Sequence, residues 1–179
     1  MSILSYNELC ELVEQGVIGP VDPKAINAAS IDVRLGPEIV CEHFKVAPPS
    51  VDIHKREVFD SYKINIEGGY DLKPGEFILA QTMETFNLPN DICAAFKLKS
   101  SGARTGLDNA LATWCDAGWN GSVLTLELKN LLRFNSLRLT PGMYIGQMLF
   151  YRVKEVPTER SYATIGRYNN DKSVQTSKL

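Results

Sequence analysis

Several features that would assign the chain to a specialised class are missing from its sequence. No apolar run approaches the roughly 20 residues of a membrane-spanning helix, and the N-terminus lacks a charged-then-apolar signal segment. The net charge is only −2, which argues against a dedicated binder of nucleic acids or membrane surfaces. We therefore expect a cytoplasmic protein that binds neither nucleic acids nor membranes.

Paired cysteines are also missing. No Cys-x-x-Cys motif occurs, and the four cysteines stand alone at positions Cys10, Cys41, Cys93 and Cys115. Isolated cysteines in a chain with these features favour reduced, mostly buried thiols over a disulfide framework.

What the sequence does contain is a series of short apolar segments with turn residues between them. An amphipathic helix is expected over residues 5–15, where Ser5 and Glu8 have capping-box spacing and Gly16 follows. Expected strands lie at residues 30–35, 38–41, 62–66, 77–82, 92–98, 111–115, 123–128 and 144–153. Their spacing of about ten residues predicts a mainly β sandwich or jelly roll rather than a βαβ fold.

The most informative stretch is Lys-Leu-Lys-Ser-Ser-Gly-Ala-Arg-Thr-Gly-Leu, at residues 97–107. Ser100 or Ser101 could cap a short helix, and Gly106 could end it. A helix N-terminus beside Lys99 and Arg104 suits a phosphate group. A capped turn with two solvated cations is the alternative.

Three stretches resemble the dCTP deaminase branch of the dUTPase superfamily. Residues 99–107 resemble its Arg-Ser-Ser-x-Ala-Arg-x-Gly-Leu phosphate motif, and residues 26–36 its Asn-x-x-Ser/Thr-x-Asp-Val-Arg-Leu-Gly signature. Residues 115–128 resemble its Ile-Asp-Pro/Ala-Gly-aromatic-x-Gly and Leu-Thr-Leu-Glu block. The resemblance implies a dUTPase-like distorted β-barrel or jelly roll with an N-terminal helix and a short helix after the Ser-Ser motif. It also implies a homotrimer, with dCTP or dUTP as substrate and Mg²⁺ on the triphosphate.

A deaminase with this sequence would have to work without zinc. His43 and His54 are the only histidines, and neither begins the motif with which zinc deaminases hold their metal, so we expect no metal ligands on the protein. The resemblance makes Glu127 the catalytic glutamate, and in a cleft this carboxylate could take a proton from water attacking C4 of cytosine. A solvent-facing strand carboxylate is the alternative. The spacing from Gly121 to Glu127 is one residue longer than the family pattern, and a β-bulge would absorb it.

The resemblance assigns roles to other residues as well. Asp116 would contact the deoxyribose 3′-hydroxyl and, in diphosphohydrolase members, position the water that attacks the α-phosphate; a turn-forming aspartate is the alternative. Trp114 stands where family members that both deaminate dCTP and hydrolyse the product to dUMP carry an aromatic residue, although it could equally be a core residue. Backbone groups near Ala112 would read the base edge. Gln147 is similar to a glutamine of the family's fourth motif, or else it is a polar-face strand residue.

Two further sets of polar side chains are candidates. Lys99, Ser100, Ser101 and Arg104 would hold the triphosphate, and the Ser100 hydroxyl could help to orient the water beside Glu127. Asp32 and Arg34 share one face of an expected strand, where we favour a structural ion pair over contact with substrate.

The chain becomes polar from about residue 160. We expect one β domain at residues 1–160 and a flexible arm at residues 161–179 that closes over the nucleotide and excludes water. The arm resembles the branch's Lys-Tyr-Gln-Gly-Gln segment, although residues 169–171 depart from it. A frayed terminus is the alternative. The candidate contacts in the arm are Tyr162, Arg167, Tyr168 and Lys172.

These features predict a zinc-free dCTP deaminase that forms dUTP and ammonia and so supplies dUMP for thymidylate synthesis. Trp114 favours a bifunctional enzyme that continues to dUMP and pyrophosphate. One alternative is a dUTP diphosphatase without deamination, against which Glu127 and the 27–36 signature argue. The other is a non-catalytic nucleotide-sensing relative, and four intact residues together argue against it: Ser100, Arg104, Asp116 and Glu127.

Overall fold

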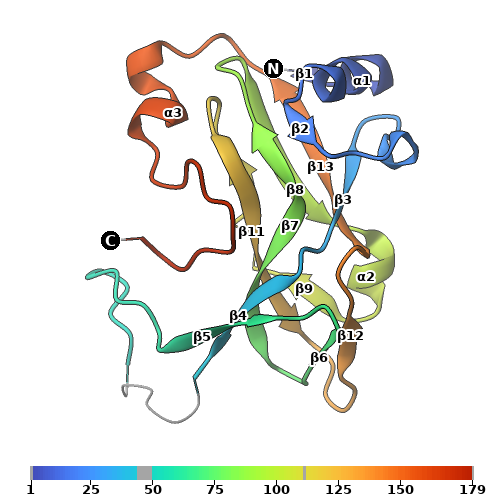
Figure 1. Cartoon of the computed structure of the whole chain (residues 1–179), viewed down its shortest axis with the longest axis vertical. Helices are drawn as coiled ribbons and strands as arrows, with labels where there is room; N and C mark the ends of the chain where they lie inside the picture. Colours follow the sequence, from blue (N-terminus) through green and yellow to red (C-terminus); the bar gives the residue numbers. More distant parts are fainter. Residues whose placement is uncertain (1, 44–49, 111, 179) are drawn as a thin grey trace.

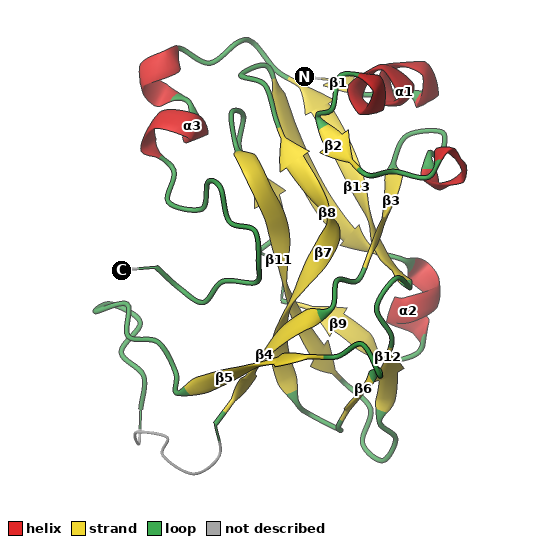
Figure 2. Ribbon diagram, viewed as in Figure 1, coloured by secondary structure: helices red, strands yellow, loops and turns green. Residues whose placement is uncertain are grey.

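Two antiparallel β-sheets make up most of the fold in the computed structural model, which describes residues 2–43, 50–110 and 112–178 (Figures 1 and 2). The first sheet has the order β1 (Ser2–Ile3), β13 (Tyr144–Arg152), β8 (Ile92–Leu98) and β10 (Trp114–Cys115), with β3 (Ile31–Arg34) also paired to β13. The second has the order β5 (Ser61–Asn65), β4 (Glu38–Glu42), β7 (Phe77–Asn87), β11 (Asn120–Asn130) and β9 (Leu107–Asn109), with β2 (Ile18–Gly19) also paired to β7.

A separate two-stranded ribbon pairs β6 (Tyr70–Leu72) with β12 (Leu137–Leu139). Neither large sheet closes on itself among the described residues, and the prediction of a mainly β, distorted jelly roll is confirmed. One hydrophobic core joins the two sheets, with Phe96 and Phe150 from the first and Phe86 and Leu128 from the second all buried.

In the described part of the chain, three short α-helices lie at the edges of the sheets: α1 (Tyr6–Glu14), α2 (Ser100–Arg104) and α3 (Tyr162–Ile165). Single 3₁₀ turns, η1 (Pro23–Ala25) and η2 (Thr158–Arg160), accompany them. The Glu8 carboxylate accepts hydrogen bonds from the backbone N and the Oγ of Ser5, both at 2.9 Å, as the capping-box spacing predicts. Across the parts of the chain that are described, no helix has the length and apolar character to pass through a membrane.

The pairing of β7 with β11 shifts register twice, once between Val123 and Thr125, where the extra residues are on β7, and once at a bulge in β11. Asn120 lies opposite Asn87 whereas Ser122 lies opposite Phe86, so β11 carries one extra residue at Gly121. Gly121 has a φ of 68°, a backbone conformation that glycine adopts without strain. The register is regular from Thr125 onward, and it places Glu127 opposite Leu79.

The predicted ion pair between Asp32 and Arg34 is wrong. Arg34 instead binds the buried carboxylate of Glu84, with Nε 2.8 Å from Oε1 and the backbone N 2.9 Å from Oε2. A buried carboxylate needs such charged partners, and this requirement draws the guanidinium toward β7. Asp32 forms an ion pair with Lys99.

The predicted serine cap of α2 is also wrong, because Lys99 occupies the cap position and Ser100 is the first helical residue. Lys99 is held by Asp32, which also accepts a hydrogen bond from Asn27 Nδ2 at 3.0 Å. The family signature at residues 27–36 thus supports the start of α2. Gly106, with a φ of 91°, follows the helix as predicted.

The expected strand at 111–115 is shorter than predicted. Only Trp114 and Cys115 pair with β8, and position 111 lies outside the described residues. The four cysteines are free, and three of them are buried.

Candidate functional site

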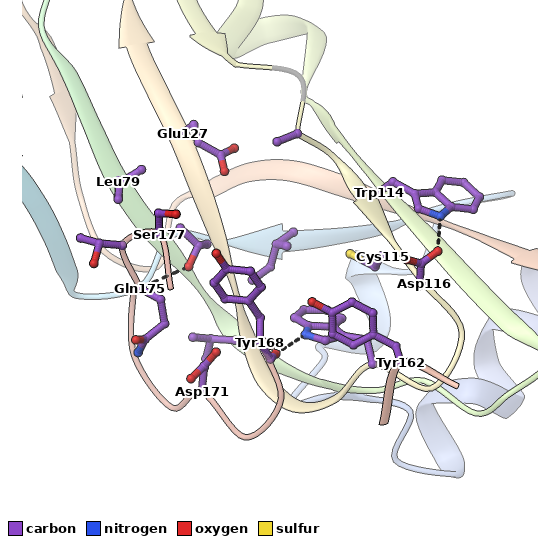
Figure 3. A pocket seen from close by; sticks show the side chains of 16 residues that line it. Leu79, Trp114, Cys115, Asp116, Glu127, Tyr162, Tyr168, Asp171, Gln175 and Ser177 are labelled. Atoms are coloured by element: carbon purple, nitrogen blue, oxygen red, sulfur yellow. Dashed lines mark hydrogen bonds between the residues drawn. The ribbon is translucent and has the colours of Figure 1, made fainter. Parts of the chain in front are cut away.

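A cavity of about 440 Å³ lies where β10, β11 and the C-terminal segment meet (Figure 3). Its walls combine aromatic, carboxylate and small polar side chains. They are Leu79, Ala112, Trp114, Cys115, Asp116, Trp119, Val123, Leu124, Thr125, Glu127, Tyr162, Tyr168, Asp171, Gln175, Thr176 and Ser177.

Glu127 faces this cavity from β11, on the same side of the strand as Val123 and Thr125. Its Oε2 atom is buried and has no hydrogen-bond partner among the described residues. Burial raises the pKa of the Glu127 carboxyl above its ordinary value of 4.5. A half-buried carboxylate with a raised pKa and a free oxygen at a cavity has the properties of a general base.

Asp116 and Trp114 lie at another wall of the cavity. Asp116 is exposed in the turn that follows β10, and its Oδ1 accepts a hydrogen bond from Trp114 Nε1 at 2.8 Å. Trp114 is 52% exposed, so it is not the core residue that the sequence left as an alternative. Ala112, which is exposed, also lines the cavity.

Trp119 is a cavity residue that sequence reasoning did not select. Its ring stacks on Phe86 with centroids 5.3 Å apart, and its Nε1 donates to the Tyr168 carbonyl oxygen at 2.6 Å. Its place in the Asp-Ala-Gly-Trp motif was a signal for it. Thr125 was missed in the same way, although it is two residues from Glu127 on one strand and therefore shares its face.

The C-terminal segment runs alongside β11 (Figure 1). Its residues Tyr162, Tyr168, Asp171, Gln175, Thr176 and Ser177 line one side of the cavity. The Val123 backbone N donates to the Asp171 carbonyl oxygen at 2.9 Å. Val174 is only 2% exposed and packs against Val40 and Leu79. Lys178 Nζ lies 2.6 Å from Asp171 Oδ1. The tail therefore forms part of the cavity wall, while its flexibility and its closure over a nucleotide stay predictions.

Tyr162 and Tyr168 from this tail line the cavity, whereas Arg167 and Lys172 do not. Arg167 is exposed. Lys172 is used structurally, since its Nζ donates to the Gly121 carbonyl oxygen at 2.7 Å. Gln175, which lines the cavity, had no recognisable signal in the sequence.

The predicted triphosphate ligands do not join the cavity within one chain. Ser100, Ser101 and Arg104 are exposed on α2, and neither they nor Lys99 contribute to its walls. Gln147 is also elsewhere, where its Oε1 accepts a hydrogen bond from Ser30 Oγ at 3.0 Å. None of the described residues that line the cavity is a lysine or an arginine.

Two further observations concern the Cys115 thiol and side chains that could bind a metal ion. Burial raises the pKa of the Cys115 thiol to about 12, so this side chain stays a neutral packing group. Within the described residues, no group of three or more His, Cys, Asp or Glu side chains is arranged to hold a metal ion.

Comparison with known proteins connects this arrangement to one family. The model of the dCTP deaminase-like family matches residues 3–153. A protein from Methanospirillum hungatei named "dCTP deaminase, dUMP-forming" is 33% identical, with 96% of this chain and 92% of that protein covered. A protein of the same name from Dictyoglomus thermophilum is 36% identical, with 99% and 94% covered.

A solved structure agrees in fold. The 2′-deoxycytidine 5′-triphosphate deaminase of Agrobacterium tumefaciens superposes with a TM-score of 0.65 at 22% identity, over 83% of this chain and 47% of that one. This chain thus spans about half the length of the superposed protein. The family match, which covers most of the chain, and the two relatives show that the protein belongs to the dCTP deaminase-like family.

Proposed function

We propose that the protein deaminates dCTP and hydrolyses the resulting dUTP to dUMP and pyrophosphate at one site. The observation that carries the proposal is the Glu127 carboxylate, which lines the cavity together with aromatic side chains and has a buried oxygen without a hydrogen-bond partner among the described residues. The relatives named as dUMP-forming deaminases support both reactions. As part of the same proposal, the enzyme acts in the cytoplasm and supplies dUMP for thymidylate synthesis.

In the first reaction, Glu127 takes a proton from a water molecule as the water oxygen bonds to C4 of cytosine. The proton passes to N3, which gives a tetrahedral intermediate at C4. Glu127 then takes the proton of the new hydroxyl on C4 and passes it to the exocyclic amine, so the C4–N bond breaks, a C4=O bond forms and ammonia leaves. The raised pKa of Glu127 suits this sequence, because the group must both accept and return protons near neutral pH.

In the second reaction, Asp116 positions a water molecule for attack on the α-phosphorus. The bond to the bridging oxygen of the β-phosphate then breaks, and pyrophosphate leaves with dUMP as the other product. Asp116 and Glu127 lie on different elements of the cavity wall, the turn after β10 and strand β11. Because each carboxylate would act on its own water molecule, a substitution of one carboxylate would remove one reaction and leave the other.

The triphosphate needs cations that one chain does not bring to its own cavity. Three carboxylates, Asp116, Glu127 and Asp171, line the walls, and of these only Asp171 forms an ion pair with a lysine among the described residues. A polyanion beside unpaired carboxylates is unfavourable without opposing charge. We therefore infer a homotrimer in which α2 of a neighbouring chain presents Ser100, Ser101 and Arg104 to the triphosphate. The substrate itself would be the Mg²⁺ complex of the nucleotide, whose charge the metal partly neutralises.

Incubation with dCTP and Mg²⁺, followed by measurement of ammonia, dUTP, dUMP and pyrophosphate, tests the proposal. Ammonia, dUMP and pyrophosphate in equal amounts are the expected products. Stable accumulation of dUTP would leave only the deaminase. Hydrolysis of added dUTP without ammonia from dCTP would indicate a dUTP diphosphatase, and binding without any product would indicate a sensing protein.

A further inference from the structure

Trp114 is held at the rim of the cavity by two specific contacts. Its Nε1 donates to Asp116 Oδ1 at 2.8 Å (Figure 3), and its ring lies against Tyr151 with centroids 5.7 Å apart. With about half of its surface exposed, this tryptophan gains less from burial than a core aromatic would. Its position at the cavity is therefore better explained by its hydrogen bond to Asp116 than by burial of its ring.

The register of the first sheet explains how the indole on β10 reaches Tyr151 on the far side of β8. Trp114 lies opposite Ala95 of β8, and Tyr151 of β13 lies opposite Cys93 of the same strand. Ala95 and Cys93 have small side chains, so the indole can extend across β8 and contact the tyrosine ring. The ring is thereby fixed from one side, while its N–H is directed toward Asp116.

Asp116 depends on this contact for its orientation. Among the described residues, the bond from Trp114 is the only hydrogen bond that the Asp116 side chain makes. An exposed carboxylate in a turn would otherwise rotate freely about its side-chain torsions. The indole N–H fixes Oδ1 and leaves Oδ2 available to accept a hydrogen bond from water or from a substrate hydroxyl.

We propose that Trp114 is a positioning residue for Asp116 and acts, through its indole N–H, in the step that releases pyrophosphate. This inference rests on the role proposed above for Asp116. It goes beyond that role because it assigns a specific atom, Nε1 of Trp114, to the alignment of the attacking water. A small misalignment of a reacting group is costly, since the attack requires near-contact distance and correct direction.

The substitution Trp114→Phe removes the N–H and keeps an aromatic ring against Tyr151. With dUTP as substrate, pyrophosphate release should fall by up to about 10²-fold, the cost of misplacing a reacting group by about 1 Å. Ammonia release from dCTP should change much less, because Glu127 lies on another element. The melting temperature should stay near that of the wild type, because the replaced side chain is half-exposed.

A double-mutant comparison separates positioning from a general disturbance of the cavity. The double variant should release pyrophosphate at the same rate as Asp116→Asn alone, because Trp114 acts only through Asp116. Trp119→Phe is the matched control, because it also removes an indole N–H from the cavity but one that binds Tyr168. Its effect should be the same in both backgrounds. An effect of Trp114→Phe that is equally large in both backgrounds, or absent in the wild-type background, would overturn the inference.

The contact can also be observed without any reaction. The chain has two tryptophans, so the ¹⁵N-labelled protein should show two indole N–H signals in solution, and Trp114→Phe assigns them. Asp116→Asn should shift the Trp114 signal and leave the Trp119 signal in place. A Trp114 signal that does not respond overturns the inference by itself. If the wild-type protein releases no pyrophosphate from dUTP, the proposed second reaction is wrong, and a shifted indole signal then shows that Trp114 holds Asp116 without serving that reaction.

Discussion

Replacing Glu127 with glutamine tests the proposed base while the size of the side chain is kept. The amide has no carboxylate to take a proton from water, so ammonia release from dCTP should fall roughly 10²–10⁴-fold. Nucleotide binding should persist, because the walls of the cavity are unchanged. Steady-state ammonia release and a separate binding titration with dCTP and Mg²⁺ measure the two effects. Glu67→Gln is the control, because the Glu67 side chain is exposed away from the cavity walls.

The same substitution should stabilise the fold at neutral pH. Oε2 of Glu127 is buried without a hydrogen-bond partner among the described residues, and an unsatisfied charged group costs more than the about 1–3 kcal/mol of an unsatisfied neutral group such as the glutamine amide. Glu127 retains partial contact with solvent, so we take the difference between the two groups as about 1 kcal/mol. A neutral amide costs less to bury than a charged carboxylate. For a chain of this size, a gain of about 1 kcal/mol raises the melting temperature by about 2–4 °C.

The gain in stability should depend on pH in one direction. Burial raises the pKa of Glu127 in the native state above its unfolded value of about 4.3. Between these two pKa values the native state binds more protons than the unfolded state, so the stability of the wild type falls as pH rises. The difference from Glu127→Gln should therefore vanish below the unfolded pKa and reach a plateau above the native one. Melting curves with equal pH dependence, or a variant that still releases ammonia at the wild-type rate, would refute the reasoning.

Three further predictions address the tail, the second carboxylate and the assembly. Truncation before Ser161 should abolish turnover and leave the two sheets folded by circular dichroism, and a truncated chain with full activity would make the tail dispensable. Asp116→Asn should reduce pyrophosphate release while dUTP still accumulates from dCTP, as followed by ion-exchange chromatography; equal loss of both reactions would contradict separate roles for the two carboxylates. Light scattering should give a mass near three chains, and a fully active monomer would disprove the trimer.

The sheets could be predicted from the sequence because the strands have clear local signals. The apolar run at residues 92–98 is strand β8, and the helix signals at Ser5, Glu8 and Gly16 match α1. The extra residue between Gly121 and Glu127 predicted a bulge, and the structure places one at Gly121. Turn-forming residues and the alternation of polar and apolar residues are sufficient to predict such features.

The partners of charged side chains could not be predicted, since they depend on which strands become neighbours. Arg34 and Asp32 were expected to pair because they alternate on one strand. In the structure, Arg34 meets Glu84 of β7, and Asp32 meets Lys99 at the start of α2. Asp32 and Lys99 are far apart in sequence, and no local pattern records such a contact.

In the candidate site, too, some residues could be predicted from the sequence and others could not. Glu127 and Asp116 carry motif signals, and both line the cavity. The tail residues that complete the wall, such as Gln175, have no local signal, because they lie there only through the path that the tail takes along β11. That path is set by contacts such as the burial of Val174 beside Leu79.

The tail has a consequence for the order in which the molecule assembles. One wall of the cavity comes from the segment after Ser161, and Val174 in this segment packs against Val40, which lies much earlier in the sequence. Contacts that close such long loops form late, because the entropy of the intervening chain must be lost first. The two sheets can therefore fold before a binding site exists. In mild denaturant the tail contacts should be lost before the sheets unfold, so nucleotide binding should be lost while the sheets are still intact.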